Sequence, residues 1–143
     1  MRIFKELRSS TNKTFLTIYF DEQENWVYNN WTGYVSPDNV KQGALAVLEA
    51  FKNFKTQFGL NDNQELVGTW DQAVDWIEEE WIPEASEAGL RFYAHIVNQE
   101  AFAAASAADM LSRIKGEFTM KIFSNSLDAK QWLYSCKEAT PKV

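Results

Sequence analysis

Residues 15–32 read FLTIYFDEQENWVYNNWT, and this stretch determines how the fold begins. Aromatic and β-branched residues dominate 15–20 and 26–32, as is typical of strands. The polar segment DEQEN between them suits a hairpin loop. Ser36 followed by Pro37 is the N-cap and first-turn pair that opens helices. The sequence therefore predicts a hairpin followed by a helix.

The first helix and the strand after it follow from the spacing of apolar residues. These recur at helical intervals, at Val40, Ala44, Val47, Phe51, Phe54 and Phe58. A short strand around 57–61 is expected next, although Phe58 then belongs to both patterns. The dipeptide Gly68-Thr69 introduces a second helix, with Thr69 as N-cap and Asp71 in the first turn. Pro83 predicts a kink or break near Trp81.

The last third of the chain continues the alternation of strands and helices. The segment 90–97, LRFYAHIV, is typical of a buried strand. Residues 98–116 are expected to be helical in two pieces, because Ser106-x-x-Asp109 resembles a new capping signal. A final strand at 118–123 precedes a helix capped by Asn125-x-x-Asp128.

The predicted order is ββαβαβαβα, which indicates an α/β fold. Strands joined by helices form parallel pairs, so we expect a mixed, mostly parallel sheet flanked by helices. The 143 residues match the length of one domain, and 45% of them are hydrophobic. A single domain over 1–143, with its core at about 14–136, is therefore expected.

The composition of the chain limits the classes of partner and of site that we expect. The 20 acidic and 14 basic residues give a net charge of −6, which disfavours nucleic acid. The single cysteine excludes an internal disulfide and a multi-cysteine metal site. Apolar runs are too short for a membrane span or signal segment, so a cytoplasmic protein is expected.

The sequence shows no catalytic constellation. His95 is the sole histidine and is expected to be a packed or hydrogen-bonded residue of a strand. Glu78, Glu79 and Glu80 are consecutive on a helix and point in different directions, which favours a solvated face over a carboxylate pair. We therefore expect no enzyme activity, no cofactor and no metal.

Several segments, in their order and spacing, carry a resemblance that runs from about Trp26 to Leu133. They are NWTGY at 30–34, LNDN at 60–63, GTWDQAVDWIEEEWIP at 68–83, AGLRFYAHIV at 88–97 and F-x5-DAKQWL at 123–133. The chain resembles small bacterial SpoIIAA-like proteins of the STAS fold, which are related in shape to the lipid-binding CRAL-TRIO (SEC14-like) domains.

That resemblance implies a regulatory site. STAS proteins that antagonise anti-sigma factors are switched by phosphorylation of a Ser or Thr at the start of the helix after the third strand. Thr69 is the matching hydroxyl here, after an expected loop at 61–68. The chain departs from the pattern, because Asp62 is followed by Asn63 and Gln64 rather than by an Asp-x-Ser segment. Thr69 as a simple N-cap is the alternative.

Two groups of residues are candidates for a site. The first, a phosphorylation or interaction site, comprises Asn61, Asp62, Asn63, Thr69, Trp70 and Asp71. Its polar cluster follows a buried strand, where open α/β sheets place ligand sites, although a turn closed by Asx side chains is the alternative. The second, a ligand or partner patch, comprises Trp31, Tyr34 and Trp76, because exposed aromatics often mark such surfaces.

The sequence thus predicts a non-enzymatic regulatory or protein-interaction module of STAS type, with a possible phospho-switch at 61–71. The alternative is a binder or carrier of a small apolar, lipid-like ligand in an aromatic-lined pocket. A symmetric homodimer is also expected, because interfaces favour aromatic residues.

Overall fold

A mixed sheet organises the chain in the computed structural model, which describes residues 1–98 and 103–139. Within those residues, six strands lie in sequential order, β1-β2-β3-β4-β5-β6. The strands are β1 (Arg2–Arg8), β2 (Thr14–Asp21), β3 (Trp26–Gly33), β4 (Phe58–Leu66), β5 (Phe92–Ile96) and β6 (Thr119–Phe123). The α-helices are α1 (Pro37–Phe54), α2 (Val74–Trp76), α3 (Ile82–Glu87), α4 (Ala103–Arg113) and α5 (Ser126–Ala139).

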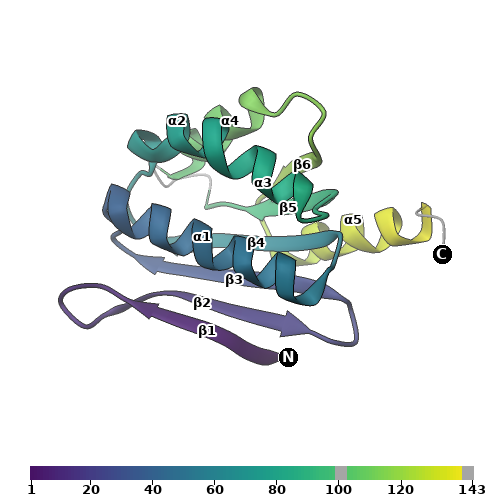
Figure 1. Ribbon diagram of the computed structural model, residues 1–143, viewed down its shortest axis with the longest axis horizontal. Coiled ribbons are helices and arrows are strands. Elements are labelled where there is room, and N and C mark those ends of the chain that lie inside the picture. The colour runs from purple at the N-terminus through teal and green to yellow at the C-terminus, as the bar shows by residue number, and fades with distance from the viewer. Residues whose placement is uncertain (99–102, 140–143) are drawn as a thin grey trace.

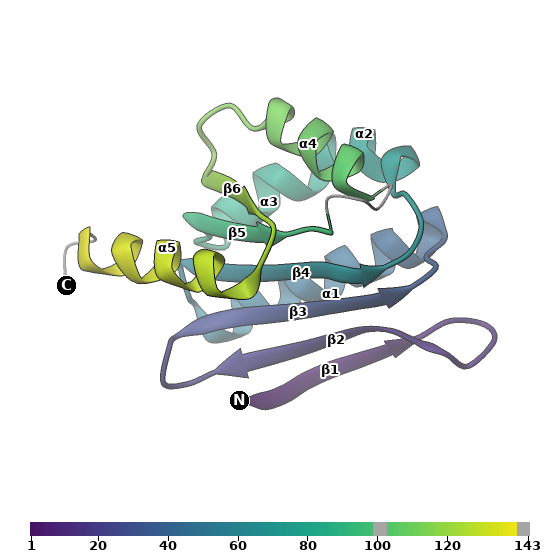
Figure 2. The ribbon, with the colours of Figure 1, turned by 180° about the vertical axis from the view of Figure 1, so that it is seen from behind.

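The connections decide which strand pairs are parallel. The first three strands pair antiparallel, and the pairs from β3 to β6 are parallel. Figure 1 shows α1 in front of the sheet, and Figure 2, from behind, shows α5 across the opposite face. The predicted α/β class, with a mixed and mostly parallel sheet between helices, is confirmed.

One strand was missing from the predicted order, which is corrected to βββαβαβαβα. The segment RIFKELR pairs with β2 as an edge strand. Only Phe4 and Leu7 in it are partly buried, and three basic residues occupy its exposed positions. Charged side chains protect sheet edges from further pairing, so this strand lacks the apolar run by which the others were recognised.

Each face of the sheet has its own core. On the face of α1, the helix packs Val40, Val47 and Phe51 into the larger cluster. On the other face, the buried residues of α5 meet side chains of β3, β4 and β5, and together they are Trp26, Phe58, Leu60, Ala94, Ile96, Ala129, Leu133 and Cys136. Because strand residues alternate between faces, each central strand contributes to both cores.

Capping at the two long helices follows the prediction. The Ser36 side chain accepts a hydrogen bond from the Asn39 amide, and the Asn39 side chain accepts one from the Ser36 amide. Asn125 similarly accepts from the Asp128 amide at α5. Helix α1 ends at Phe54, and Lys55 has φ of 53°. Phe58 therefore belongs to β4 alone.

The second helix differs from the prediction at its start. A 3₁₀ turn at Asp71–Ala73 precedes α2, and its N-cap position is Trp70 rather than Thr69. The Thr69 hydroxyl donates to the Asp71 carboxylate. A π-helical turn at Ile77–Trp81 lies directly before α3, which contains Pro83. The predicted irregularity near Trp81 is thus present, as expected where proline removes a backbone donor.

The predicted break at Ser106 is wrong. Ser106 lies inside α4, and its buried hydroxyl oxygen accepts a hydrogen bond from the backbone N–H of Trp70, 3.1 Å away. The side chain therefore joins two segments instead of starting a helix. Part of the predicted helical region, residues 99–102, lies outside the described residues.

Gly43 sets how closely α1 approaches the sheet. A Cβ at this position would lie 2.8 Å from Cζ3 of Trp31 and 2.9 Å from Cδ2 of Leu16. We expect Gly43→Ala to lower the free energy of unfolding by about 1–3 kcal/mol through overpacking, although alanine is normally the better helix former. Urea unfolding measures this. Gln42→Ala, at an exposed neighbouring position, is the control, and a Gly43→Ala protein as stable as the wild type would contradict the prediction.

Candidate functional site

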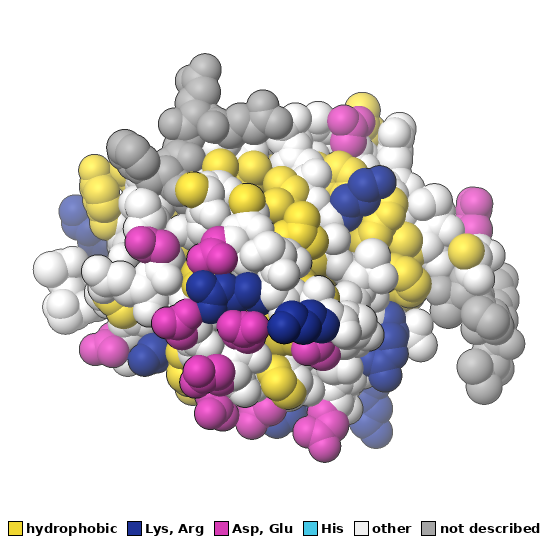
Figure 3. Space-filling view, turned by 90° about the horizontal axis from the view of Figure 1, so that it is seen from above, with side chains coloured by type: hydrophobic (Ala, Val, Ile, Leu, Met, Phe, Trp, Pro, Cys, Tyr) yellow, Lys and Arg dark blue, Asp and Glu magenta, His cyan; other side chains and the backbone are white. Residues whose placement is uncertain are grey.

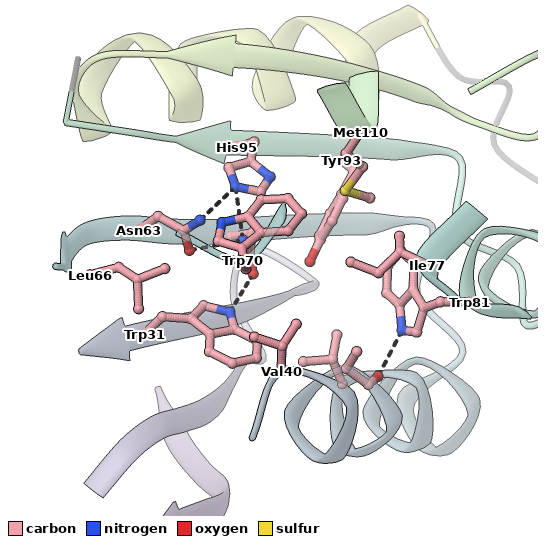
Figure 4. Close-up of a pocket in the computed structure, with 13 residues that line it drawn as sticks. Trp31, Val40, Asn63, Leu66, Trp70, Ile77, Trp81, Tyr93, His95 and Met110 are labelled. Carbon is pink, nitrogen blue, oxygen red and sulfur yellow. Dashed lines mark hydrogen bonds between the residues drawn. The ribbon is translucent and has the colours of Figure 1, made fainter. Parts of the chain in front are cut away.

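A pocket lies between the sheet and the helices on the α1 face. Its volume is about 50 Å³, enough for several water molecules or part of a small ligand. Apolar and aromatic side chains form most of its wall: Trp31, Val40, Ala44, Val47, Leu66, Trp70, Ile77, Trp81, Tyr93 and Met110. The polar members are Asn61, Asn63 and His95 (Figure 4). An apolar pocket with a few polar groups is typical of small-molecule sites.

Strand alternation places the polar side chains together. Asn61 is paired with His95 in the parallel β4–β5 register, and Asn63 lies two residues further along the same face. Tyr93 shares the face with His95 and lies beside Gly59. A Cβ on Gly59 would lie 2.6 Å from Cδ1 of Tyr93, so the glycine leaves the space that the Tyr93 ring occupies. The pocket lies toward the carboxyl ends of these strands, where open α/β sheets bind ligands.

A chain of hydrogen bonds fixes the orientation of the polar groups. The Trp31 indole Nε1 donates to Oδ1 of Asn61 over 2.9 Å. An indole N–H can only donate, so the Asn61 amide must present its Nδ2 on the other side. That Nδ2 contacts Oδ1 of Asn63 at 3.3 Å and Nε2 of His95 at 3.2 Å. Nδ2 of Asn63 lies 3.0 Å from the same Nε2.

This arrangement selects one tautomer of His95. Two amide N–H groups point at Nε2, so Nε2 accepts and the ring proton resides on Nδ1. The His95 side chain is 2% exposed, and burial lowers its pKa from 6.5 to about 3. His95 is therefore neutral at pH 7. Because its acceptor nitrogen is already engaged, it is poorly placed to act as a base.

Two residues that line the pocket each carry a donor that has no acceptor among the described residues. The donors are Nδ1 of His95 and the indole Nε1 of Trp70, and both atoms are buried. A third buried atom without a partner there, Oδ1 of Asn29, lies beside the pocket, since Nδ2 of Asn29 donates to the Tyr93 hydroxyl over 3.3 Å. Buried polar groups are normally hydrogen-bonded, so such unpaired donors indicate an occupant that supplies acceptors.

The position of Trp70 is fixed by its neighbours. Its backbone N–H bonds to Ser106, and its ring stacks on His95 with centroids 5.9 Å apart. The indole of Trp81, by contrast, donates to the carbonyl of Ala44 over 2.7 Å (Figure 4). Trp31 and Trp81 thus use their N–H groups within the protein, whereas the N–H of Trp70 has no acceptor in residues 1–98 and 103–139.

An ionic cluster holds α4 to the segment that precedes α3. Arg113 contacts Asp75, Glu78 and Asp109 at 2.6, 3.1 and 3.1 Å. Figure 3 looks onto this side of the molecule and shows basic side chains among acidic ones, with no histidine at the surface. The hydrogen bonds to Asp75 and Asp109, with a smaller contribution from Glu78, raise the pKa of Arg113, so it stays charged. This cluster fixes the helices that supply Met110 and Ile77 to the pocket.

The structure divides the first predicted site. Asn61, Asn63 and Trp70 line the pocket, whereas Asp62 faces the other side and accepts a hydrogen bond from the Tyr28 hydroxyl over 2.8 Å. The expected loop at 61–68 is wrong, because residues 61–66 continue β4 and pair with β3, and with β5 up to Asp62. Main-chain pairing on both sides replaces the predicted turn up to Asp62, and at the irregularity that follows the Gln64 amide donates to Oδ1 of Asp62 over 3.0 Å, as in the alternative Asx turn.

The remaining predicted residues lie outside the pocket lining. Thr69 and Asp71 are exposed and bond to each other. Of the predicted aromatic patch, Trp31 lines the pocket, but Tyr34 is 78% exposed and Trp76 is half-buried next to Lys41. Trp31, Tyr34 and Trp76 therefore do not form one ligand wall.

Sequence reasoning did not assign Tyr93 and His95 to the site, although it expected His95 to be packed or hydrogen-bonded. The signal was their spacing of two in LRFYAHIV, which puts both side chains on one face of a strand. Strand register was also needed to pair them with the asparagines of β4, and it came only with the structure.

Residues 1–98 and 103–139 contain no group of three or more His, Cys, Asp or Glu side chains that could hold a metal ion. In the same residues, no helix combines the length and the apolar character that crossing a membrane requires.

Comparisons with known proteins identify the fold. No protein-family model matches the sequence, and no curated protein matches it significantly. Among solved structures, the chain is similar to a DUF3478-family protein with a SpoIIAA-like fold from Shewanella loihica PV-4. The two share 19% identity over 82% of this chain and 91% of the other, with a TM-score of 0.55. The chain therefore has a SpoIIAA-like fold, as the sequence resemblance predicted.

The buried His95 should make stability depend on pH. The unfolded chain binds a proton below pH 6.5, whereas the folded chain does so only near pH 3, so stability falls as pH decreases between these values. From about pH 7.5 to about pH 5.5, the free energy of unfolding should fall by about 1.4 kcal/mol more in the wild type than in His95→Gln. Urea unfolding measures the free energy of unfolding of both proteins at each pH. The difference between the two proteins removes the pH dependence that the carboxylates contribute equally to both. Parallel pH curves would contradict this assignment.

Proposed function

We propose that this protein is a non-enzymatic, STAS-type binding module that takes a small, largely apolar ligand into the pocket under α1. The observation that carries the proposal is the pair of buried donors, on His95 and Trp70, that have no acceptor among the described residues. Leaving each unpaired costs about 1–3 kcal/mol, and an occupant with acceptors removes that cost.

The pocket supports binding better than chemistry. Its lining, as far as the structure describes it, contains no carboxylate, lysine, cysteine or hydroxyl residue other than Tyr93. Burial raises the pKa of Tyr93, which therefore stays protonated, and Nε2 of His95 is occupied by two amides. A general base or activated nucleophile is thus missing from this wall, which favours a carrier or sensor over a catalyst.

The phospho-switch at Thr69 stays a prediction with less support from the geometry. Its hydroxyl is accessible, but it donates to the carboxylate of Asp71. A phosphate there would lie against this negative charge, which opposes the modification instead of stabilising it. The 3₁₀ turn at Asp71–Ala73 runs directly into α2, so the dipole at this helical N-terminus would offset only part of the repulsion.

Binding can be tested with the ¹⁵N-labelled chain and small aromatic probes such as acetophenone. The indole signals of Trp31, Trp70 and Trp81 should shift, because these rings line the pocket. Val40→Phe fills the pocket from α1 and should weaken binding by about tenfold or more, which corresponds to about 1.4 kcal/mol.

Leu45→Phe is the matched control, because Leu45 lies on the same helix but is 50% exposed and outside the pocket. It should leave the affinity unchanged. Thermal unfolding of each variant confirms that it is folded. Binding that survives Val40→Phe, or probes that leave all three indole signals unmoved, would contradict the proposal.

A further inference from the structure

Among the described residues, the polar side chains of the pocket have acceptor atoms that are already hydrogen-bonded and two donors that are not. Oδ1 of Asn61 already accepts from Trp31, and Oδ1 of Asn63 already accepts from Asn61. Nε2 of His95 accepts from both asparagines. Within the part of the chain that the structure describes, the unpaired groups of this wall are therefore the N–H of His95 Nδ1 and the N–H of Trp70 Nε1. A ligand matched to this wall must bring acceptors.

Charge limits the ligand further. Among the described lining residues, none is lysine or arginine, and the one histidine is neutral because it is buried. A carboxylate or phosphate in the pocket would lose its hydration without gaining an opposite charge. Such unpaired burial is strongly unfavourable. The matched acceptor is therefore uncharged, such as a carbonyl oxygen or a ring nitrogen.

The shape of the wall favours a flat molecule. The rings of Trp31, Trp70, Trp81 and Tyr93 surround the space with planar surfaces, and their rims are closed by aliphatic side chains such as Val40 (Figure 4). Aromatic surfaces pack well against other rings in stacked or edge-on contacts. A volume of about 50 Å³ holds part of a ring, and a whole ring enters only if the surrounding side chains move apart, so the ligand must be compact and a long acyl chain does not fit.

Resting on the binding function proposed above, we infer that the pocket selects neutral, planar, apolar compounds that carry a carbonyl or equivalent acceptor, with Trp70 and His95 as the residues that read this acceptor. A ketone, lactone or quinone of one or two rings has this chemistry. The donors distinguish such compounds from plain hydrocarbons, and the absence of a cation on the described wall distinguishes them from acids.

Three probes of nearly the same shape test the inference on the full chain: acetophenone, cumene and benzoate. Each has one phenyl ring and a forked substituent, which is a ketone, a hydrocarbon or a carboxylate. Acetophenone should bind about tenfold more tightly than cumene, as expected for hydrogen bonds to otherwise unpaired donors. Benzoate should bind about tenfold or more weakly than acetophenone. Affinities come from indole ¹H–¹⁵N titrations.

A pair of conservative variants assigns the effect to Trp70. Trp70→Phe keeps an aromatic ring but removes the donor, and should reduce the preference for acetophenone over cumene by several-fold. Trp76→Phe is the control, because Trp76 does not line the pocket, and should keep the full preference. In the wild type, acetophenone should also move the Trp70 Nε1–H signal downfield while cumene does not, a readout that holds even if the variant is unstable.

The outcomes separate this inference from the proposed function. Equal binding of cumene and acetophenone would overturn the inference but leave a ligand pocket, with water as the partner of the donors. Tightest binding of benzoate would overturn the neutral character of the ligand. Failure of all three probes to bind would overturn the inference together with the binding function.

Discussion

The hydrogen bond from the Trp31 indole to Asn61 determines the chemistry of the pocket. It crosses from β3 to β4 and, because the indole can only donate, it orients the Asn61 amide. The amide orients Asn63 and sets the tautomer of His95 on β5. Three neighbouring strands thus contribute to one hydrogen-bond network on the pocket floor. The Trp31 indole, at one end of this network, determines which groups in it donate and which accept.

Helix α1 makes this network possible, because it covers the strands and keeps solvent away. The chain enters the helix through the reciprocal cap of Ser36 and Asn39, and Gly43 lets the helix approach Trp31 closely. Burial then makes His95 neutral and leaves its N–H without a partner among the described residues. The pocket therefore depends on the close packing of α1 on one side and on the polar side chains of the strands on the other.

Most of the fold could be predicted from local signals, because caps and short apolar runs act within a few residues. Ser36 and Asn125 each begin a helix through their own side chains, and LRFYAHIV is apolar enough to indicate a buried strand. The strand β1 was missed because an exposed, basic edge strand has no apolar run. The asparagines of β4 predict a loop from the sequence, because polar residues rarely occupy the centre of a buried strand.

Only part of the pocket lining could be predicted from the sequence, because local signals do not show which residues of different strands lie together. Asn61, Asn63, Trp31 and Trp70 were singled out by residue type, but their union with His95 depends on strand register. Register is a long-range property, and no local pattern in either strand specifies it. Residue type alone groups Tyr34 and Trp76 with Trp31, but the structure places them outside the pocket lining.

The bare backbone of Gly59 has an evolutionary consequence. The rings of Tyr93 and Phe51 both occupy the space that a side chain at this position would need, with Cζ of Phe51 only 2.7 Å from the place of a Cβ. A lineage could replace Gly59 only if a ring on β5 or α1 became smaller at about the same time. Changes at these three positions should therefore be inherited together.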